Sequence, residues 1–154
     1  MRLTDRFSEE GIIIDSPAST KKEIIEVLVD KLCEVYAIEN KEGVHEAVLG
    51  REKKMSTGIG CGLAVPHTKI DIVNKMCIVA ATSTKGINFD AIDKEPVFLL
   101  FLIVSPTNTT GPHIRALSAI SRIMSDAEIR KSLIASQAAS EFYQQLRLGE
   151  EKYT

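Results

Sequence analysis

His67 is the first residue in the sequence whose type and position suggest chemistry. It follows Pro66 directly after the short apolar run Leu63-Ala64-Val65. Because a proline restricts the backbone around it, we expect the imidazole to emerge in a defined direction at the end of a strand. Neutral imidazole keeps a free nitrogen lone pair near neutral pH, and such a nitrogen can attack phosphorus and later leave from it. The position is compatible with a reversible phosphoryl carrier and equally with an ordinary structural histidine.

His113 and Arg51 are the residues that could hold an anion beside it. His113 follows Gly111 and Pro112 at the predicted start of a helix, where free N–H groups and the helix dipole favour an anion. The same dipole disfavours protonated imidazole, so we expect a neutral His113 that donates one hydrogen bond to a phosphoryl oxygen. The guanidinium fork of Arg51 suits phosphate oxygens, although a charged side chain on a helix end is also commonly just solvated.

Three glycines, Gly58, Gly60 and Gly62, precede this histidine at alternate positions. Without side chains they would let backbone N–H groups approach phosphoryl oxygens, or they form a simple turn. No Gly-Lys-Ser/Thr triplet opens a helix here, so the segment is not a P-loop. The glycines also come before a strand, whereas a dinucleotide fingerprint follows one. Neither nucleotide motif is present.

Two other chemistries compete for the same residues. His67, His113, Cys61 and Cys77 could converge on zinc, but they lack the close paired spacing of structural zinc ligands. Cys61 could be a hydrolase nucleophile with one of these histidines as its base, but no GxSxG elbow or orienting acid is evident. The third histidine, His45, has the spacing of an exposed helix position.

Short apolar runs alternate with helical patterns along the chain. Strands are predicted at residues 12–14, 63–65, 76–82 and 97–104, and the last is apolar on both faces, as in a central strand covered by helices. Residues 56–62 favour no regular element. Helices are predicted after the capping-box pair Thr20 and Glu23, over residues 41–53 with Asn40 as cap, from Pro112, from Asp126 to residue 134, and over residues 138–146. The helix from Pro112 is expected to bury Ile114, Leu117, Ile120, Ser121 and Met124. This alternation predicts an α/β fold.

Composition narrows the class of protein. The chain has 154 residues, 44% hydrophobic and 26% charged, which is typical of one globular domain. A net charge of -2 without a basic stripe argues against a nucleic-acid partner. The longest apolar run, residues 97–104, is too short to span a membrane, and the N-terminus has no signal-peptide pattern. Three cysteines without a CxxC pair suit a reducing compartment, so we expect a cytoplasmic protein.

The segment around His67 resembles a known active site. Arg51-Glu52, the run Ser56-Thr57-Gly58-Ile59-Gly60-Cys61-Gly62 and Pro66-His67 together resemble the active-site segment of the mannitol/fructose-class enzyme IIA domains of the bacterial phosphoenolpyruvate-dependent sugar phosphotransferase system. The nitrogen-regulatory IIA proteins belong to the same class. Residues 87–97 are similar to the stretch before that family's central strand, and His113 matches its second histidine. The resemblance covers nearly the whole chain.

This resemblance implies a fold and a set of site residues. The fold would be one IIA domain over residues 1–154, with a mixed β-sheet and helices packed on both faces. The activity would be that of a phosphotransferase with a phosphohistidine intermediate at Nε2 of His67. His113 and Arg51 would flank and stabilise the phosphoryl group, with a lesser phosphoryl-binding role for Ser56, Thr57 and Gly58.

The resemblance also implies partners. A histidine phosphocarrier protein would donate the phosphoryl group, and a IIB component would accept it for fructose- or mannitol-type sugar uptake. The alternative is a nitrogen-regulatory protein whose phosphorylation state controls a target protein. Neither a metal nor another cofactor is expected, because direct transfer between a histidine of the donor protein and a histidine of the acceptor needs none if the two meet in line. Docking predicts an exposed apolar patch around His67 that includes Leu63, Ile70 and Ile72.

Overall fold

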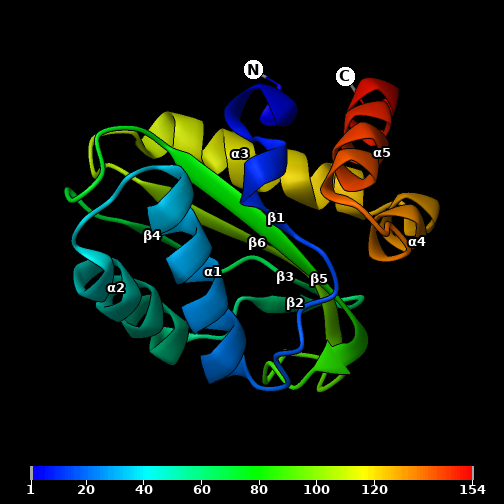
Figure 1. Ribbon diagram of the computed structural model, residues 1–154, viewed down its shortest axis with the longest axis horizontal. Coiled ribbons are helices and arrows are strands. Elements are labelled where there is room, and N and C mark those ends of the chain that lie inside the picture. The colour runs from blue at the N-terminus through cyan, green and yellow to red at the C-terminus, as the bar shows by residue number, and fades with distance from the viewer. Residues whose placement is uncertain (1, 154) are drawn as a thin grey trace.

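Helices and short strands alternate along the chain, and the computed structural model describes residues 2–153. The elements are η1 (Leu3–Arg6), η2 (Glu9–Gly11), β1 (Ile12–Ile13), α1 (Lys21–Val35), α2 (Lys41–Lys54), β2 (Gly58–Gly60), β3 (Leu63–Ala64), β4 (His67–Lys69), β5 (Cys77–Ile87), β6 (Val97–Ser105), α3 (Thr110–Met124), α4 (Ala127–Ile134) and α5 (Ala139–Lys152). Figure 1 shows the sheet between its helices. Among these helices, none has the length and apolar character needed to cross a membrane.

The six strands form one mixed sheet centred on β6. The strand order is β1-β5-β6-β3-β2, and β4 also pairs with β6. β5 and β6 are antiparallel, whereas β3 and β4 both run parallel to β6 along its other edge. β3 pairs with the start of β6, at Leu99 and Leu100, and β4 pairs with its end, from Ile103 to Ser105. The chain between β3 and β4 therefore follows β6 towards the end from which α3 departs.

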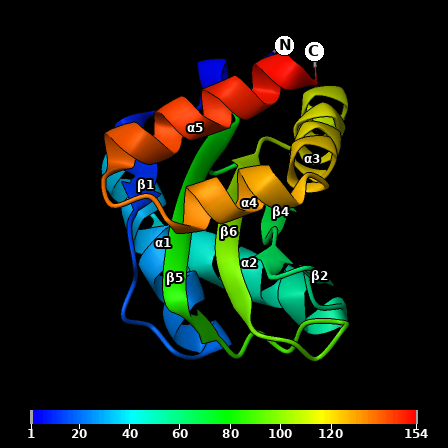
Figure 2. The same cartoon turned by 90° about the vertical axis from the view of Figure 1, so that its right-hand side faces the viewer.

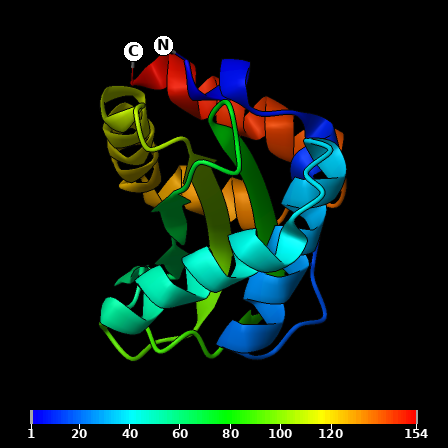
Figure 3. The same ribbon diagram turned by 90° about the vertical axis from the view of Figure 1, so that its left-hand side faces the viewer.

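Two apolar layers, one on each face of the sheet, make up the core. Alternate residues of β6 point to opposite faces, as the strand period requires. Leu100, Leu102 and Val104 pack with α1 and α2. Leu99, Phe101 and Ile103 pack with α3, α4 and α5. Figure 2 shows α4 and α5 in front of the sheet, and Figure 3 shows α1 and α2 in front of the other face. The predicted α/β fold with helices on both faces is confirmed.

Three helices begin where their capping residues predict. Thr20 accepts a hydrogen bond from the N–H of Glu23, and Asn40 accepts one from Gly43. Asp126 accepts hydrogen bonds from the N–H groups of Glu128 and Ile129. Each of these side chains satisfies a donor that the first turn leaves free, so the helix starts were readable from sequence.

The prediction that residues 56–62 form no regular element was wrong. Gly58–Gly60 form β2, which pairs with β3 through a two-residue turn at Cys61 and Gly62. Both turn residues have positive φ, 56° and 74°, as tight hairpin turns require. Gly60 also has positive φ. The glycines therefore make a hairpin possible at this point of the chain.

The predicted helix from Pro112 needs two corrections. α3 begins two residues earlier, at Thr110, and Pro112 is its third residue, where the missing N–H still removes no helical hydrogen bond. Ile114 and Ser121 are exposed, whereas His113 and Ala116 face the core. The predicted face was displaced because apolar type alone placed it, and the helix instead turns a histidine inwards.

Two elements extend beyond their predicted ends. β5 runs to Ile87 with a register shift after Thr82, so its polar second half was missed. α5 continues to Lys152, because Glu150 accepts hydrogen bonds from Leu3 and Thr4 and Gly149 packs closely against Ile129 of α4. Long-range contacts, absent from a local pattern, stabilise both extensions.

Candidate active site

His67 and His113 meet at the end of the central strand. Their ring centroids are 5.5 Å apart, and the ring planes make an angle of 54°. His67 begins β4, which pairs with the end of β6, and His113 lies in the first turn of α3, which follows β6. The pairing of β4 with β6 thus brings together two histidines that are separated by 45 residues of chain. The predicted juxtaposition of the two rings is present.

The imidazole of His67 has a defined orientation. Its Nδ1 lies 2.7 Å from the carbonyl oxygen of Val65. Because a carbonyl oxygen only accepts, Nδ1 carries the hydrogen, and in the neutral ring Nε2 keeps the lone pair. The ring is half-buried. His67 starts a strand and does not end one as predicted, since β3 stops at Ala64 and Pro66 links it to β4.

His113 is buried and held in its neutral form. The residue is 4% exposed, and Nδ1 of its ring lies 2.8 Å from the hydroxyl oxygen of Ser105. Burial, followed by the nearby charges of His67 and Lys69, lowers the pKa of His113 from 6.5 to about 4. A neutral ring bonded through Nδ1 to a hydroxyl can present Nε2–H as a donor.

The first turn of α3 has donors that no side chain caps. Thr109, its N-cap residue, makes no side-chain bond to the helix, and its hydroxyl donates to the carbonyl of Pro106 instead. The ammonium of Lys69 lies 3.1 Å from the hydroxyl oxygen of Thr110. A helix N-terminus and a lysine beside two imidazoles form a surface that is favourable to an anion.

The hydrogen bond of Arg51 is made to the backbone at the end of α2. It is in the last turn of α2, and its Nη1 donates to the carbonyl oxygen of Met55, 3.0 Å away. In the part of the chain that the structure describes, it makes no hydrogen bond to either imidazole. The guanidinium therefore stabilises the backbone just after α2. To contact a phosphoryl group it would have to break its hydrogen bond to Met55.

Ser56, Thr57 and Gly58 all make hydrogen bonds within the protein. The hydroxyl and N–H of Thr57 both donate to Glu52, and the N–H of Gly58 lies 3.1 Å from the Ser56 hydroxyl. Gly58 is a glycine for a packing reason, because a Cβ there would lie 2.8 Å from the Cβ of Ala91. These contacts describe a tightly packed support for the site.

The predicted apolar patch around His67 has a different composition. Leu63 is 3% exposed and packs under α3, while Ile70 and Ile72 are half-buried against the α1–α2 layer. The prediction was wrong for Leu63, which β3 places in the core, whereas Ile70 and Ile72 each keep part of their surface exposed. Ile114, next to His113, is 55% exposed, and Ile59 in β2 is 52% exposed.

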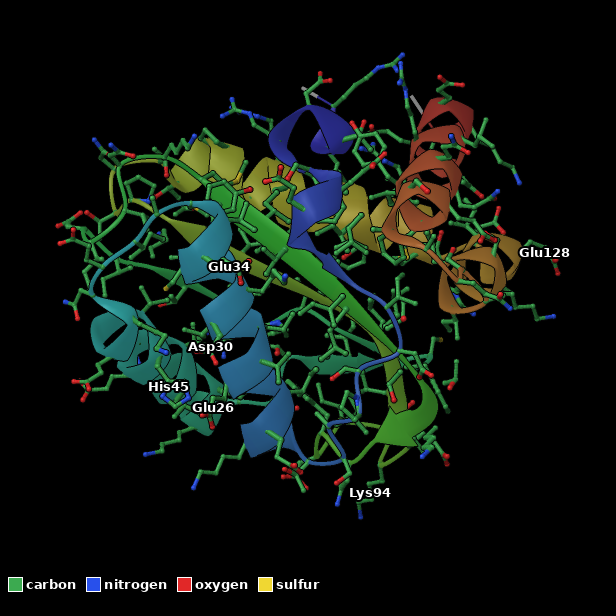
Figure 4. The ribbon with its side chains drawn as sticks, viewed as in Figure 1. Glu26, Asp30, Glu34, His45, Lys94 and Glu128 are labelled. Carbon is green, nitrogen blue, oxygen red and sulfur yellow. The ribbon has the colours of Figure 1, made fainter. Side chains whose placement is uncertain are left out.

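The cysteines and the third histidine lie elsewhere. Cys77 is buried, with its sulfur 3.4 Å from the carbonyl of Lys75, and Cys61 is exposed in the β2–β3 turn. No group of three metal-ligating side chains converges within residues 2–153. His45 was predicted to be exposed, but it is half-buried, and its Nε2 is buried without a hydrogen-bond partner in the described chain. It lines a small hollow with Glu26 and Asp30 of α1 (Figure 4).

A wide hollow lies away from the histidines. It lies where β5 ends and β6 begins, and its lining includes Lys85, Asn88 and Pro96. That is the opposite end of β6 from Ile103, which pairs with His67. A partner would therefore reach His67 at its own half-exposed surface and not through this hollow.

Sequence reasoning missed three residues that support the site. Ser105 bonds His113, Lys69 approaches the start of α3, and Glu52 binds Thr57. Ser105 ends the most apolar strand of the chain, and a polar residue at that point is a usable signal. The partners of Lys69 and Glu52 depend on how β4 and the exit of α2 are folded, and no local pattern reports that.

Comparison with known proteins gives a consistent result. The family model described as "Phosphoenolpyruvate-dependent sugar phosphotransferase system, EIIA 2" matches residues 6–148. A PTS system fructose-specific EIIA component from Haloferax volcanii is 35% identical over 129 residues, 84% of each chain. A nitrogen regulatory protein from Bradyrhizobium diazoefficiens is 34% identical over 148 residues, 96% of each chain.

Solved structures share the fold. The nitrogen regulatory protein IIA-Ntr from Neisseria meningitidis superposes with a TM-score of 0.87 at 30% identity, over 94% of this chain and 98% of that one. IIA mannitol from Escherichia coli superposes with a TM-score of 0.78 at 25% identity, over 90% and 97% of the two chains. The residues that the family model matches, 6–148, include both His67 and His113.

Proposed function

The chain belongs to the EIIA 2 family of the phosphoenolpyruvate-dependent sugar phosphotransferase system, whose members are phosphotransferases, and we propose that His67 is its phosphoryl-carrying residue. The observation that carries this proposal is the hydrogen bond between Nδ1 of His67 and the carbonyl of Val65. That bond leaves Nε2 as the nucleophilic nitrogen. We take the chain, residues 1–154, to act as one such domain.

The transfer step follows from the arrangement of the two rings. The lone pair on Nε2 of His67 forms a bond to phosphorus as the bond from phosphorus to the donor's nitrogen breaks, and the donor nitrogen recovers its electron pair. The Nδ1–H bond to Val65 persists and spreads the charge that develops on the ring. In the next transfer the acceptor's nucleophile forms a bond to phosphorus as the bond from phosphorus to Nε2 of His67 breaks, and Nε2 recovers its lone pair.

His113 and the start of α3 stabilise the transferring group. A neutral His113 that accepts from Ser105 at Nδ1 donates through Nε2 to a phosphoryl oxygen. The uncapped N–H groups of α3 and the ammonium of Lys69 add positive potential. Arg51 joins them if it exchanges its bond to Met55 for the phosphoryl group. Ser56, Thr57 and Gly58 act as support for the site.

The partners are proteins of the same relay. The donor is a histidine phosphocarrier protein, and the acceptor is a IIB component, in keeping with the relative named as a fructose-specific EIIA component. A regulatory role, in which the phosphorylation state controls a target protein, is the second candidate. It is favoured by the match to a nitrogen regulatory protein over 96% of each chain. We place either relay in the cytoplasm, with no cofactor.

Ile114 is the proposed docking contact for these partners. It is 55% exposed, and it lies next to His113 on the first turn of α3. Exposed aliphatic side chains beside a reactive group are favourable sites for a small, transient protein interface. The interface would bring the partner's reactive residue to Nε2 of His67.

Labelling tests the proposal directly. The chain, incubated with labelled phosphoenolpyruvate, enzyme I and the phosphocarrier protein, should take up label, and His67→Ala should abolish it. His113→Ala should keep the acceptor nitrogen but slow transfer. His45→Ala is the matched control, since these are the three histidines of the sequence, and it should label normally. Normal labelling of His67→Ala would overturn the assignment.

A further inference from the structure

Glu52 is a buried carboxylate with three donors around it. It lies in the last turn of α2 and is 4% exposed. It accepts from the N–H of Thr57 at 2.7 Å and from the hydroxyl of Thr57 at 2.6 Å. The ammonium of Lys21, the first residue of α1, lies 2.9 Å from it. These bonds join the start of α1, the end of α2 and the segment before β2.

The burial of this charge is costly, which calls for a reason beyond stability. A carboxylate in the last turn of a helix lies at the negative end of the dipole, and removing it from water costs several kcal/mol before pairing. Buried ion pairs are often no better for stability than apolar residues of the same volume. What the carboxylate provides here is the fixed direction of three hydrogen bonds.

A continuous path of hydrogen bonds leads from Glu52 to the reactive imidazole. The carbonyl of Thr57 accepts from the N–H of Val65 at 3.0 Å. The carbonyl of Val65 in turn lies 2.7 Å from Nδ1 of His67. Thr57 and Val65 are both buried, and Pro66 restricts the chain between Val65 and His67. A displacement of Thr57 is therefore passed to the carbonyl that orients the ring.

We propose that Glu52 is a positioning residue for phosphoryl transfer, which acts through Thr57 and Val65 to hold His67 in its Nδ1–H form with Nε2 free. The inference rests on the proposed role of His67. The bonds of Glu52 are to Thr57 and Lys21, so its effect on the ring passes through Thr57 and Val65, while Lys21 neutralises its charge.

Glutamine is the informative substitution because it keeps the size of the side chain. An amide has one accepting oxygen and no charge, so Glu52→Gln loses the ion pair with Lys21. Its NH2 group faces the Thr57 hydroxyl, which must then accept instead of donate, so the geometry that the carboxylate imposes on Thr57 is lost. Thr57→Val removes the hydroxyl and keeps the shape, whereas Thr57→Ser keeps the hydroxyl.

The chain supplies a matched control in Glu150. This second buried glutamate lies in the last turn of α5 and accepts from the N–H and hydroxyl of Thr4, with the hydroxyl at 2.6 Å. It also accepts from the N–H of Leu3. Glu150→Gln therefore makes the same chemical change to the same type of carboxylate–threonine contact. It does so in α5, whereas His67 and His113 lie in β4 and α3 (Figure 1).

The test combines 15N NMR of the His67 ring with the rate of phosphoryl uptake from the phosphocarrier protein. Glu52→Gln and Thr57→Val should both convert the Nδ1–H form of His67 into a mixture of tautomers and slow uptake by about 10- to 100-fold, as expected for a small misplacement of a reacting group. Thr57→Ser and Glu150→Gln should retain both wild-type readouts.

Two results would overturn the inference. One is an unchanged His67 spectrum and uptake rate in folded Glu52→Gln, or in Thr57→Val if the first variant does not fold. The other is an equal effect from Glu150→Gln, which would mean general loss of stability. The ring spectrum needs no phosphoryl transfer, so it distinguishes failure of this inference from failure of the role proposed for His67.

Discussion

Acid should destabilise this protein partly through one side chain, His113. The ring is buried, and its pKa is lowered from 6.5 to about 4, by burial first and then by the charges of His67 and Lys69. In the unfolded chain the same ring titrates near 6.5. Between these two values the unfolded state binds the extra proton, so the free energy of unfolding falls as the pH falls.

The size of the effect follows from the two pKa values. Each pH unit between them is worth about 1.4 kcal/mol, so acidification from pH 7 to pH 4.5 should cost roughly 2.5 kcal/mol through His113. That is a large part of the free energy of unfolding of a typical domain, which is about 5–15 kcal/mol. His113→Gln removes the titrating ring and keeps a polar group that can bond Ser105.

Urea unfolding of both proteins at pH 7 and pH 4.5 measures this contribution. Glutamate and aspartate side chains titrate in both proteins and cancel in the comparison. The variant should lose roughly 2.5 kcal/mol less than the wild type on acidification. An NMR titration of the wild-type ring should give a midpoint near 4. A midpoint above about 6, or equal acid sensitivity of the two proteins, would refute the reasoning.

Two further predictions concern packing and docking. Gly58→Ala should destabilise the fold by about 1–3 kcal/mol in urea unfolding, because its Cβ would lie 2.8 Å from Ala91. Gly50→Ala, in α2 with open space around its Cβ, should instead stabilise by about 0.5–1 kcal/mol, and a destabilised Gly50→Ala would contradict this account. Ile114→Lys should slow uptake from the phosphocarrier protein by about 10-fold with stability unchanged. Leu148→Lys, at an equally exposed apolar position of α5, should not, and equal rates for the two would remove the docking role of Ile114.

Local signals in the sequence were sufficient for the framework of the fold. Thr20, Asn40 and Asp126 cap helices where their side chains predict, because capping involves atoms only two or three residues apart. The doubly apolar run in β6 gave the central strand, because a strand covered on both faces has no polar period. Errors arose where strands lack an apolar pattern, as in the polar second half of β5 and in β2, which consists of two glycines and one isoleucine.

The sequence by itself determined which chemistry was available, since residue type decides that imidazole at 67 and 113 can carry or stabilise a phosphoryl group. The family resemblance implied Nε2 of His67 as the reactive nitrogen, but only the tertiary structure decided what leaves it free, because Nδ1 is engaged by the carbonyl of Val65, a residue that itself bonds Thr57. The tertiary structure also decided that Arg51 bonds Met55 and that Glu52 is enclosed. Burial and hydrogen-bond direction arise from contacts across the whole fold, and residue order does not contain them locally.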